Sequence, residues 1–364
     1  NSWRASAYAG GSPGEDDSGI IPNPGDIVIN EILAHSHGLA ADWIELYNTT
    51  GSQIDIGGWY LSDSKNDLKK YRFTDGTKID AYDYLVLYQD ANFGDFSIDP
   101  GKITGFAFSE NGDEAYLSSA EGDPHGAGVL TGYRAVEDFG ASYTGVSFGR
   151  YYKGSTDSYN FVPMDYNTPG DDNTYPAVGP VVISEIMYNP DWPAGGMYAN
   201  DRYEYIELYN ITDAPVKLYR DDKALPWKFS EGIEFVFPDY PNEAVIWPND
   251  YIVVVRDVNA FTWRYPGVPA GKIYGPYDSQ LDNAGERVEI SMPGDIDMFG
   301  RQYYIRIDRV TYSDGSHPGN EPGDLDLWPT EADGAGKSLT RITPELYGND
   351  PNNWTPASPS PAGP

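Results

Sequence analysis

The side chains that most often carry chemistry are few in this chain. Four histidines occur, and two of them, His35 and His37, stand in the run HSH. Two imidazoles at this spacing lie on one side of an extended segment and could seat a transition metal. No further ligand is identifiable near them, and a polar loop explains the pair more simply because short motifs often match by chance. Whether a metal binds stays unknown from the sequence.

Catalytic motifs are absent from the sequence. There is no cysteine among the 364 residues, which excludes disulfides, thiolate metal sites and cysteine nucleophiles. No nucleophile elbow, Walker loop or zinc-protease motif occurs. Acidic residues are so common that singling out a glycosidase-like pair would be arbitrary. We therefore expect no catalytic residues and no enzymatic activity.

The charge balance limits the partners. With 24 basic and 56 acidic residues the net charge is −32, a field that repels nucleic acids and anionic lipid surfaces. No run of 18 apolar residues exists, so we expect no membrane insertion. Loop acids such as Asp171, Asp172, Asp324 and Asp326 could offer oxygen ligands to calcium. Turn formation explains these residues better, so we expect no cofactor beyond loosely bound calcium.

Seven blocks of sequence recur in one order, which indicates an internal repeat. The pairs are IVINEIL (27–33) and VVISEIM (181–187), WIELYN (43–48) and YIELYN (205–210), GWYLSD (58–63) and PWKFSE (226–231), YLVLYQDANF (84–93) and YIVVVRDVNAF (251–261), FAFSENGDEAYLSS (106–119) and SQLDNAGERVEISM (279–292), VSFGR (146–150) and KSLTR (337–341), FVPMDYNTPGDDN (161–173) and WTPASPSPAGP (354–364). The second copy carries a longer early loop, which surface loops accommodate at little cost. We interpret the chain as two copies of one module, residues 25–175 and 180–364, joined by the short proline-containing linker YPAVGP.

We expect residues 1–24 to be an N-terminal arm. Its segment 1–17 has an aromatic, a short extended run, then Pro-Gly and acids, as in the closing segments of both modules. One interpretation is that the arm is the last strand and exit of a preceding module, with Trp3, Arg4, Ala5 and Ser6 as an assembly strand. The other interpretation is an ordinary N-terminal arm.

Each repeated block reads as a strand. Runs of four to eight residues rich in Val, Ile, Tyr and Phe alternate with clusters of Gly, Asp, Asn and Pro. In WIELYN, Ile44 and Leu46 share one parity, as in a half-buried strand. Helical periodicity is nearly absent, and residues 257–265 are the best candidate for a helical turn. The pattern predicts an all-β protein of two tandem β-sandwiches.

The repeated blocks resemble the lamin-tail domain, an immunoglobulin-like sandwich found in nuclear lamins and in bacterial extracellular proteins. The resemblance is carried by Ile-x-Glu-Ile (29–32 and 183–186), the two hexapeptides, Gly58-Trp59, Gly112-Asp113, Ser-x-x-Arg (147–150 and 338–341) and the Pro-Gly-like exits. The second copy departs from it at Pro226, where the first copy has Gly58. The resemblance implies immunoglobulin-like folds in a module of a secreted or surface-attached protein, as in planctomycete-like bacteria, and it implies no catalytic residues.

The repeated glutamates suggest a structural role. Ile29 and Glu31 share parity, as do Ile183 and Glu185, so we expect each glutamate to point inward beside a buried isoleucine. A buried carboxylate needs a partner. The repeated arginine is the natural candidate, which predicts ion pairs Glu31–Arg150 and Glu185–Arg341.

Two functions remain open at this stage. The first is a structural or adhesive module of a bacterial extracellular or cell-surface protein, which self-associates or binds other surface proteins and could assemble head-to-tail into a filament. The second is a pair of polysaccharide-binding accessory domains of a larger secreted enzyme, with glycans bound on exposed aromatic side chains.

Overall fold

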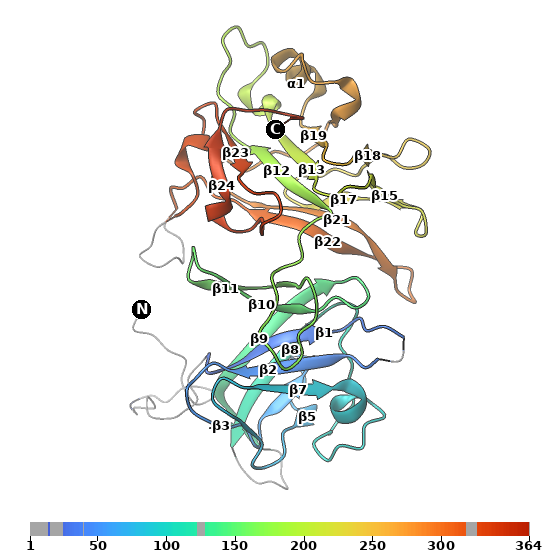
Figure 1. Ribbon diagram of the computed structural model, residues 1–364, viewed down its shortest axis with the longest axis vertical. Helices are drawn as coiled ribbons and strands as arrows, with labels where there is room; N and C mark the ends of the chain where they lie inside the picture. The colour runs from blue at the N-terminus through green and yellow to red at the C-terminus, as the bar shows by residue number, and fades with distance from the viewer. Residues whose placement is uncertain (1–13, 15–24, 39, 122–127, 318–325, 364) are drawn as a thin grey trace. The chain divides into compact units, whose positions relative to one another are not determined.

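The computed structural model describes residues 14, 25–38, 40–121, 128–317 and 326–363. Within these residues the regular structure is mostly strand (Figure 1), so the all-β prediction is confirmed. The single α-helix of the described part, α1 (Val258–Arg264), lies in the segment predicted to form a helical turn. None of the described helices is long and apolar enough to span a bilayer.

The chain divides into two compact units. Unit 1 comprises residues 1–151 and 160–176, and unit 2 comprises residues 152–159 and 177–364. The division after Pro176 falls within the linker YPAVGP, whereas the short segment 152–159 is grouped with unit 2. Each unit is described by itself below.

Unit 1 is built from two antiparallel layers. One layer has the order β11 (Ser158–Pro163), β10 (Phe148–Lys153), β1 (Ile27–Leu33), β2 (Trp43–Asn48), β7 (Tyr84–Tyr88). The other has the order β9 (Val129–Ala141), β8 (Asn111–Glu121), β4 (Tyr60–Ser62), β5 (Tyr71–Arg72). A short pair β3 (Ile54–Asp55) and β6 (Lys78–Ile79) and a helical turn η1 (Gln89–Phe93) complete the unit.

The core of unit 1 lies between these layers. Alternate residues of β1 and β2, Ile29 and Leu46 among them, are buried against Leu117 and Phe139 of the opposite layer. The alternation arises because successive side chains of a strand point to opposite faces. Burial of apolar side chains is the main stabilising contribution to such a core. It also fixes which residues of β1 and β2 face outward.

Unit 2 has the same kind of layers. Its larger sheet has the order β20 (Ile273–Tyr274), β19 (Tyr251–Val255), β13 (Tyr205–Asn210), β12 (Val181–Met187), β23 (Ser338–Arg341), β24 (Trp354–Ala357). The facing layer has the order β17 (Lys228–Glu231), β21 (Arg287–Ile296), β22 (Gln302–Thr311). Minor elements are β14 (Val216–Lys217) with β18 (Val245–Ile246), β15 (Tyr219–Arg220) with β16 (Leu225–Pro226), and the 3-10 turns η2 (Asn200–Tyr203), η3 (Ala270–Lys272), η4 (Thr330–Ala332) and η5 (Pro351–Asn353).

Unit 2 also buries part of the outer face of its larger sheet. Helix α1 begins at the N-cap Asp257, whose side chain accepts from two backbone amides. Its Phe261 packs edge-on against Tyr205 of β13, with ring centroids 5.5 Å apart. Val253 and Ala362 join this small cluster. The outer face of β12 and β13 is therefore covered by the helix and by the closing segment of the unit.

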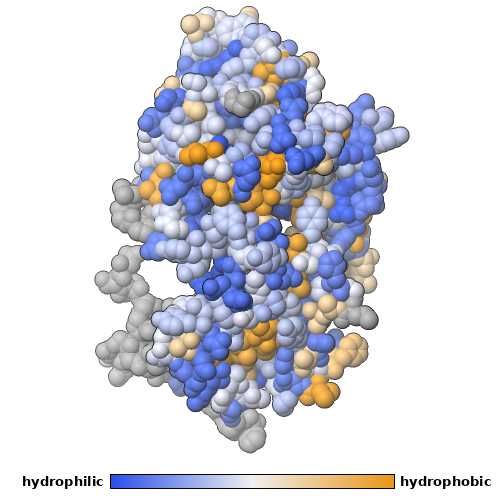
Figure 2. Space-filling model, in the orientation of Figure 1, coloured by the Kyte–Doolittle hydropathy of each residue, from blue (hydrophilic) through white to orange (hydrophobic). Residues whose placement is uncertain are grey.

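The face of the molecule drawn in Figure 2 is mostly hydrophilic, with hydrophobic side chains in separate small patches. This agrees with the excess of acidic residues. No broad apolar surface covers this face.

Candidate functional site: paired buried glutamates

Glu31 and Glu45 lie opposite each other on the outer face of the unit 1 sheet. In the antiparallel pairing of β1 with β2, Glu31 is the Cα partner of Glu45, and a β-bulge separates Ile29 from Glu31. The bulge adds one residue to β1. It thereby reverses the parity, so that Ile29 and Ile32 face the core while Glu31 faces away from it. The inward orientation predicted for Glu31 is therefore wrong.

The closing segment of unit 1 covers this glutamate pair. Ser147 at the start of β10 donates its hydroxyl to Glu31 Oε1 at 2.5 Å. Thr168 donates its backbone amide and its hydroxyl to Glu31 Oε2, at 3.2 and 3.1 Å. Two residues further on, the amide of Gly170 donates to Glu45 Oε2 at 2.5 Å. Asn30 supplies a further donor to Glu45 Oε1, at 2.7 Å.

Unit 2 repeats this arrangement at the equivalent positions. Glu185 lies opposite Glu207 after a bulge at the same place in β12. Ser338 donates its hydroxyl to Glu185 Oε1, and Ser184 donates to Glu207 Oε1 at 2.6 Å.

The closing segment of unit 2 then completes the site. The amide of Ser360 donates to Glu185 Oε1 at 3.3 Å, and the amide of Ala362 donates to Glu207 Oε2 at 2.7 Å. Figure 1 shows this end of the chain beside β12 and β13. In both units one peptide therefore bonds to both carboxylates.

Burial controls the acidity of the paired carboxyl groups. The four glutamates are between 0% and 2% exposed. Burial raises the pKa of Glu45 to about 7, and the neighbouring charge of Glu31 raises it further. In the same way, burial and the charge of Glu185 raise the pKa of Glu207 to about 8. Burial also raises the pKa of Glu31 and of Glu185, against the effect of their hydroxyl and amide donors.

Two carboxyl groups that share one site raise the pKa of one of them, and both members of each pair are buried. The closing segments cover them, and their oxygens accept from groups of the same unit. The geometry is that of a clamp, in which buried acceptors fix the position of a peptide. The clamp glutamates, as we call Glu31, Glu45, Glu185 and Glu207, hold the closing segments in place.

The predicted ion pair Glu185–Arg341 is wrong. Arg341 Nη1 lies 2.6 Å from Asp308 Oδ2, and both side chains are buried. Asp308 in turn accepts from the amide of Ile183 at 2.8 Å. Because Glu185 faces the outer side of the sheet, it receives its donor from Ser338, the first residue of the Ser-x-x-Arg motif. The partner of Glu185 is therefore the serine of the Ser-x-x-Arg motif and not its arginine.

In unit 1, Glu31 receives the hydroxyls of Ser147 and Thr168 in place of the expected Arg150 guanidinium. Arg150 acts on a different carboxyl group: its charge lowers the pKa of Glu137, which burial raises to about 7. The bulge again gives the physical reason, since it places Glu31 on the face opposite to the core.

The asparagines that end the two hexapeptides are structural. Asn48 and Asn210 are fully buried. Asn210 Nδ2 donates to the carbonyl oxygens of Ala214 and Ile246 at 2.8 and 2.9 Å, and its Oδ1 accepts from the amide and hydroxyl of Thr212. Asn48 and Thr50 repeat the pattern. The Asn-x-Thr pattern thus serves the turn that follows the strand.

Histidines and loop acids offer few metal ligands in the described part of the chain. His35 contacts Ser142 O and Thr144 Oγ1. Ligand atoms of Asp314, His317 and Asp326 lie within 4.8 Å of one another. However, Asp326 already accepts from Ser313 Oγ and from the amides of His317 and Trp328, which is how acids order a turn.

Other predicted site residues divide between described and undescribed parts of the chain. Asp172 accepts from the hydroxyl of Tyr84 at 2.7 Å, and Asp171 accepts from the amide of Asp172. Asp324 and the predicted assembly strand Trp3, Arg4, Ala5 and Ser6 lie outside the described residues.

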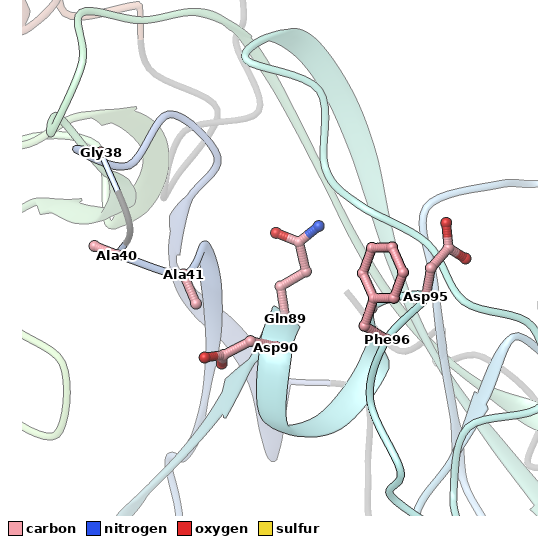
Figure 3. Close-up of a pocket in the computed structure, with 8 residues that line it drawn as sticks. Gly38, Ala40, Ala41, Gln89, Asp90, Asp95 and Phe96 are labelled. Carbon is pink, nitrogen blue, oxygen red and sulfur yellow. The ribbon is translucent and has the colours of Figure 1, made fainter.

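A shallow cavity of about 230 Å³ lies in unit 1. Gln89 and Asp90 of η1 and Phe96 of the following loop line it, opposite Ala40 and Ala41 (Figure 3). Its described lining has two acids, Asp90 and Asp95, and no histidine, serine or lysine. This lining offers no activated nucleophile.

Sequence reasoning identified Glu31 and Glu185 but missed Glu45 and Glu207. The signal was present, since a glutamate stands at the same place in WIELYN and YIELYN, opposite in parity to two core residues. Glu204 was also missed. It is buried in unit 2 beside Arg256 at 3.0 Å, and burial raises its pKa to about 7.

Comparison with known proteins supports the fold. No curated protein and no solved structure matches the chain. One family model matches, and it extends from before β1 to beyond the end of β8, so it includes Glu31 and Glu45. This match agrees with the immunoglobulin-like arrangement of the two β-layers in unit 1. Over residues 21–127 the chain is similar to the Lamin Tail Domain.

Proposed function

We propose that the chain is a non-catalytic structural or adhesive part of a bacterial extracellular or cell-surface protein, made of two copies of one lamin-tail-like module. The observation that carries the proposal is the peptide clamp, in which backbone amides of the closing segment donate to the paired glutamates of each unit. A site built to hold a peptide in place suits a mechanical role. The family match over residues 21–127 supports a non-catalytic module in the same way.

The proposed mode of action is self-association, head-to-tail, into a filament or matrix. The N-terminal residues 1–17, which resemble the closing segments, would join one chain to the next. A connection of this kind places a different surface on each partner, and it extends into an open filament when its rotation does not close a ring. Sedimentation velocity of the full chain over a hundredfold range of concentration tests it. A growing series of oligomers is expected, and a strict monomer at the highest concentration would refute self-association.

A second candidate is binding of polysaccharide by exposed aromatic side chains. Trp192 and Trp247 of unit 2 are 60% and 61% exposed, and Tyr240 is 70% exposed. Aromatic faces of this kind stack on sugar rings. Retention of the chain on insoluble cell-wall glycan, lost on Trp247→Ala, would favour this function. Absence of retention on a panel of glycans would rule out polysaccharide binding.

A further inference from the structure

The two clamps recognise the same short peptide pattern. The clamped residues are Thr168-Pro169-Gly170 in unit 1 and Ser360-Pro361-Ala362 in unit 2. In each, the first and third amides donate to the two glutamates. The residue between them is a proline, which has no N–H to satisfy. The pattern is a hydroxyl residue, a proline and a small residue.

The third position requires a particular backbone. Gly170 has a φ of 88° and Ala362 a φ of 64°. This left-handed region costs little for glycine and is uncommon for other residues. The proline favours an extended conformation in the residue before it. The clamp therefore selects an extended first residue followed two places later by a left-handed turn.

A third copy of the pattern occurs at Ser12-Pro13-Gly14. Gly14 is exposed and has a φ of 85°, close to the value of Gly170. A Cβ atom built on Gly14 would have no atom within 4 Å. The two clamps of the described residues hold their own closing segments, so the chain carries three such peptides for two sites.

The unit 2 clamp is the less completely filled of the two. Glu185 is 1% exposed, its Oε2 accepts no hydrogen bond from the closing segment, and a hydrogen bond from the Tyr205 side chain acts to lower the pKa of its carboxyl group. The equivalent atom in unit 1, Glu31 Oε2, accepts from the hydroxyl and amide of Thr168. The closing segment of unit 2 therefore gives its first glutamate one donor fewer than the closing segment of unit 1 does. A peptide that brings its hydroxyl to this atom would complete the site.

We propose that the Glu185–Glu207 pair is a peptide-binding site that accepts Ser12-Pro13-Gly14 from a second copy of this chain. Ser12 takes the place of Ser360 and donates its hydroxyl to Glu185 Oε2, and the amide of Gly14 donates to Glu207. The inference rests on the proposed self-association and names its contact. The incoming peptide competes with a tethered segment, whose effective concentration is of the order of millimolar. Exchange is therefore expected at high chain concentration or after the tethered segment is released.

A labelled synthetic peptide of residues 1–17 tests the site directly. The receptor is the full chain carrying Ala362→Pro, which removes the amide donor to Glu207 and forbids the left-handed backbone. The peptide should bind this variant at least tenfold more tightly than the unaltered chain. A Gly14→Pro peptide should lose binding, whereas the matched Gly10→Pro peptide should keep it. Equal binding of both altered peptides, or no binding of any peptide to a folded receptor, overturns the proposal.

A second measurement decides the question if the receptor variant does not fold. Sedimentation velocity of the full chain with Gly14→Pro should show at least a tenfold weaker self-association than the full chain with Gly10→Pro. Association that is equal in the two variants overturns the clamp contact and leaves the proposed self-assembly standing. A chain that never associates refutes self-assembly, and the peptide experiment then decides the site alone.

Discussion

Glu31 and Glu45 are direct cross-strand neighbours, yet both are fully buried. Like charges in this position destabilise a sheet when both are ionised. Here the hydroxyls and amides of the closing segment surround the pair, and the raised pKa of Glu45, about 7, allows one carboxyl to hold a proton near neutral pH. The same solution at Glu185 and Glu207 shows that the pair and its closing peptide form one structural unit.

Ser338→Ala removes the hydroxyl that donates to Glu185. A buried acceptor left without its donor typically costs about 1–3 kcal/mol, so the free energy of unfolding should fall by about that amount in urea titrations. Ser358→Ala, an exposed position in the same closing segment, is the matched control and should change stability by less than about 0.5 kcal/mol. Equal effects of the two substitutions would contradict the clamp.

The clamp predicts that stability falls as the pH rises through neutrality. The folded state holds a proton on Glu207 up to a pKa of about 8, whereas the unfolded chain loses it near the ordinary value of 4.5. Between these values the folded state binds more protons, so the free energy of unfolding decreases with pH, at up to about 1.4 kcal/mol per pH unit for each proton. Urea titrations between pH 5.5 and 8.5 measure the slope.

The matched variants for this pH experiment are Glu207→Gln and Glu234→Gln. The first removes one titrating group and should make the slope shallower, leaving the part that comes from Glu45 and Glu204. The second changes an exposed glutamate of the same unit and should leave the slope intact. A slope that is the same in both variants would show that Glu207 does not hold the proton.

The strands could be predicted well from the sequence, for a physical reason. Blocks such as IVINEIL and WIELYN coincide with β1 and β2 because burial of one face imposes a period of two on each strand. Helix α1 was also predicted within one residue at each end. These features depend on local pattern and burial, which a single sequence contains.

The clamp could be predicted only in part, because the sequence gives no signal for the β-bulge. One extra residue between Ile29 and Glu31 moves the glutamate to the other face. Counting parity from Ile29 therefore placed Glu31 inward and favoured an arginine partner. The actual donors, Ser147 and Thr168, lie 116 and 137 residues away along the chain. Such contacts depend on the path of the closing segment, which local patterns do not encode.

A double-mutant cycle checks the corrected partner of Arg341. Removing one member of a buried ion pair typically lowers the free energy of unfolding by about 3–5 kcal/mol. Arg341→Met and Asp308→Asn should each destabilise unit 2 and should show a coupling energy of about 1–3 kcal/mol. The cycle of Arg341→Met with Glu185→Gln should give a smaller coupling, because Glu185 bonds to Ser338 instead. A larger coupling energy between Arg341 and Glu185 than between Arg341 and Asp308 would support the Glu185–Arg341 ion pair instead.

Asn210→Ala tests the turn that follows the second hexapeptide. The substitution leaves the carbonyl oxygens of Ala214 and Ile246 without their donor and frees the amide of Thr212. Because Asn210 is fully buried, water cannot replace these bonds without opening the turn. We expect a loss of about 2–4 kcal/mol in the free energy of unfolding, above the typical cost of one buried hydrogen bond. The exposed Asn242→Ala is the matched control in unit 2, and a comparable loss there would show that the effect does not come from the buried amide.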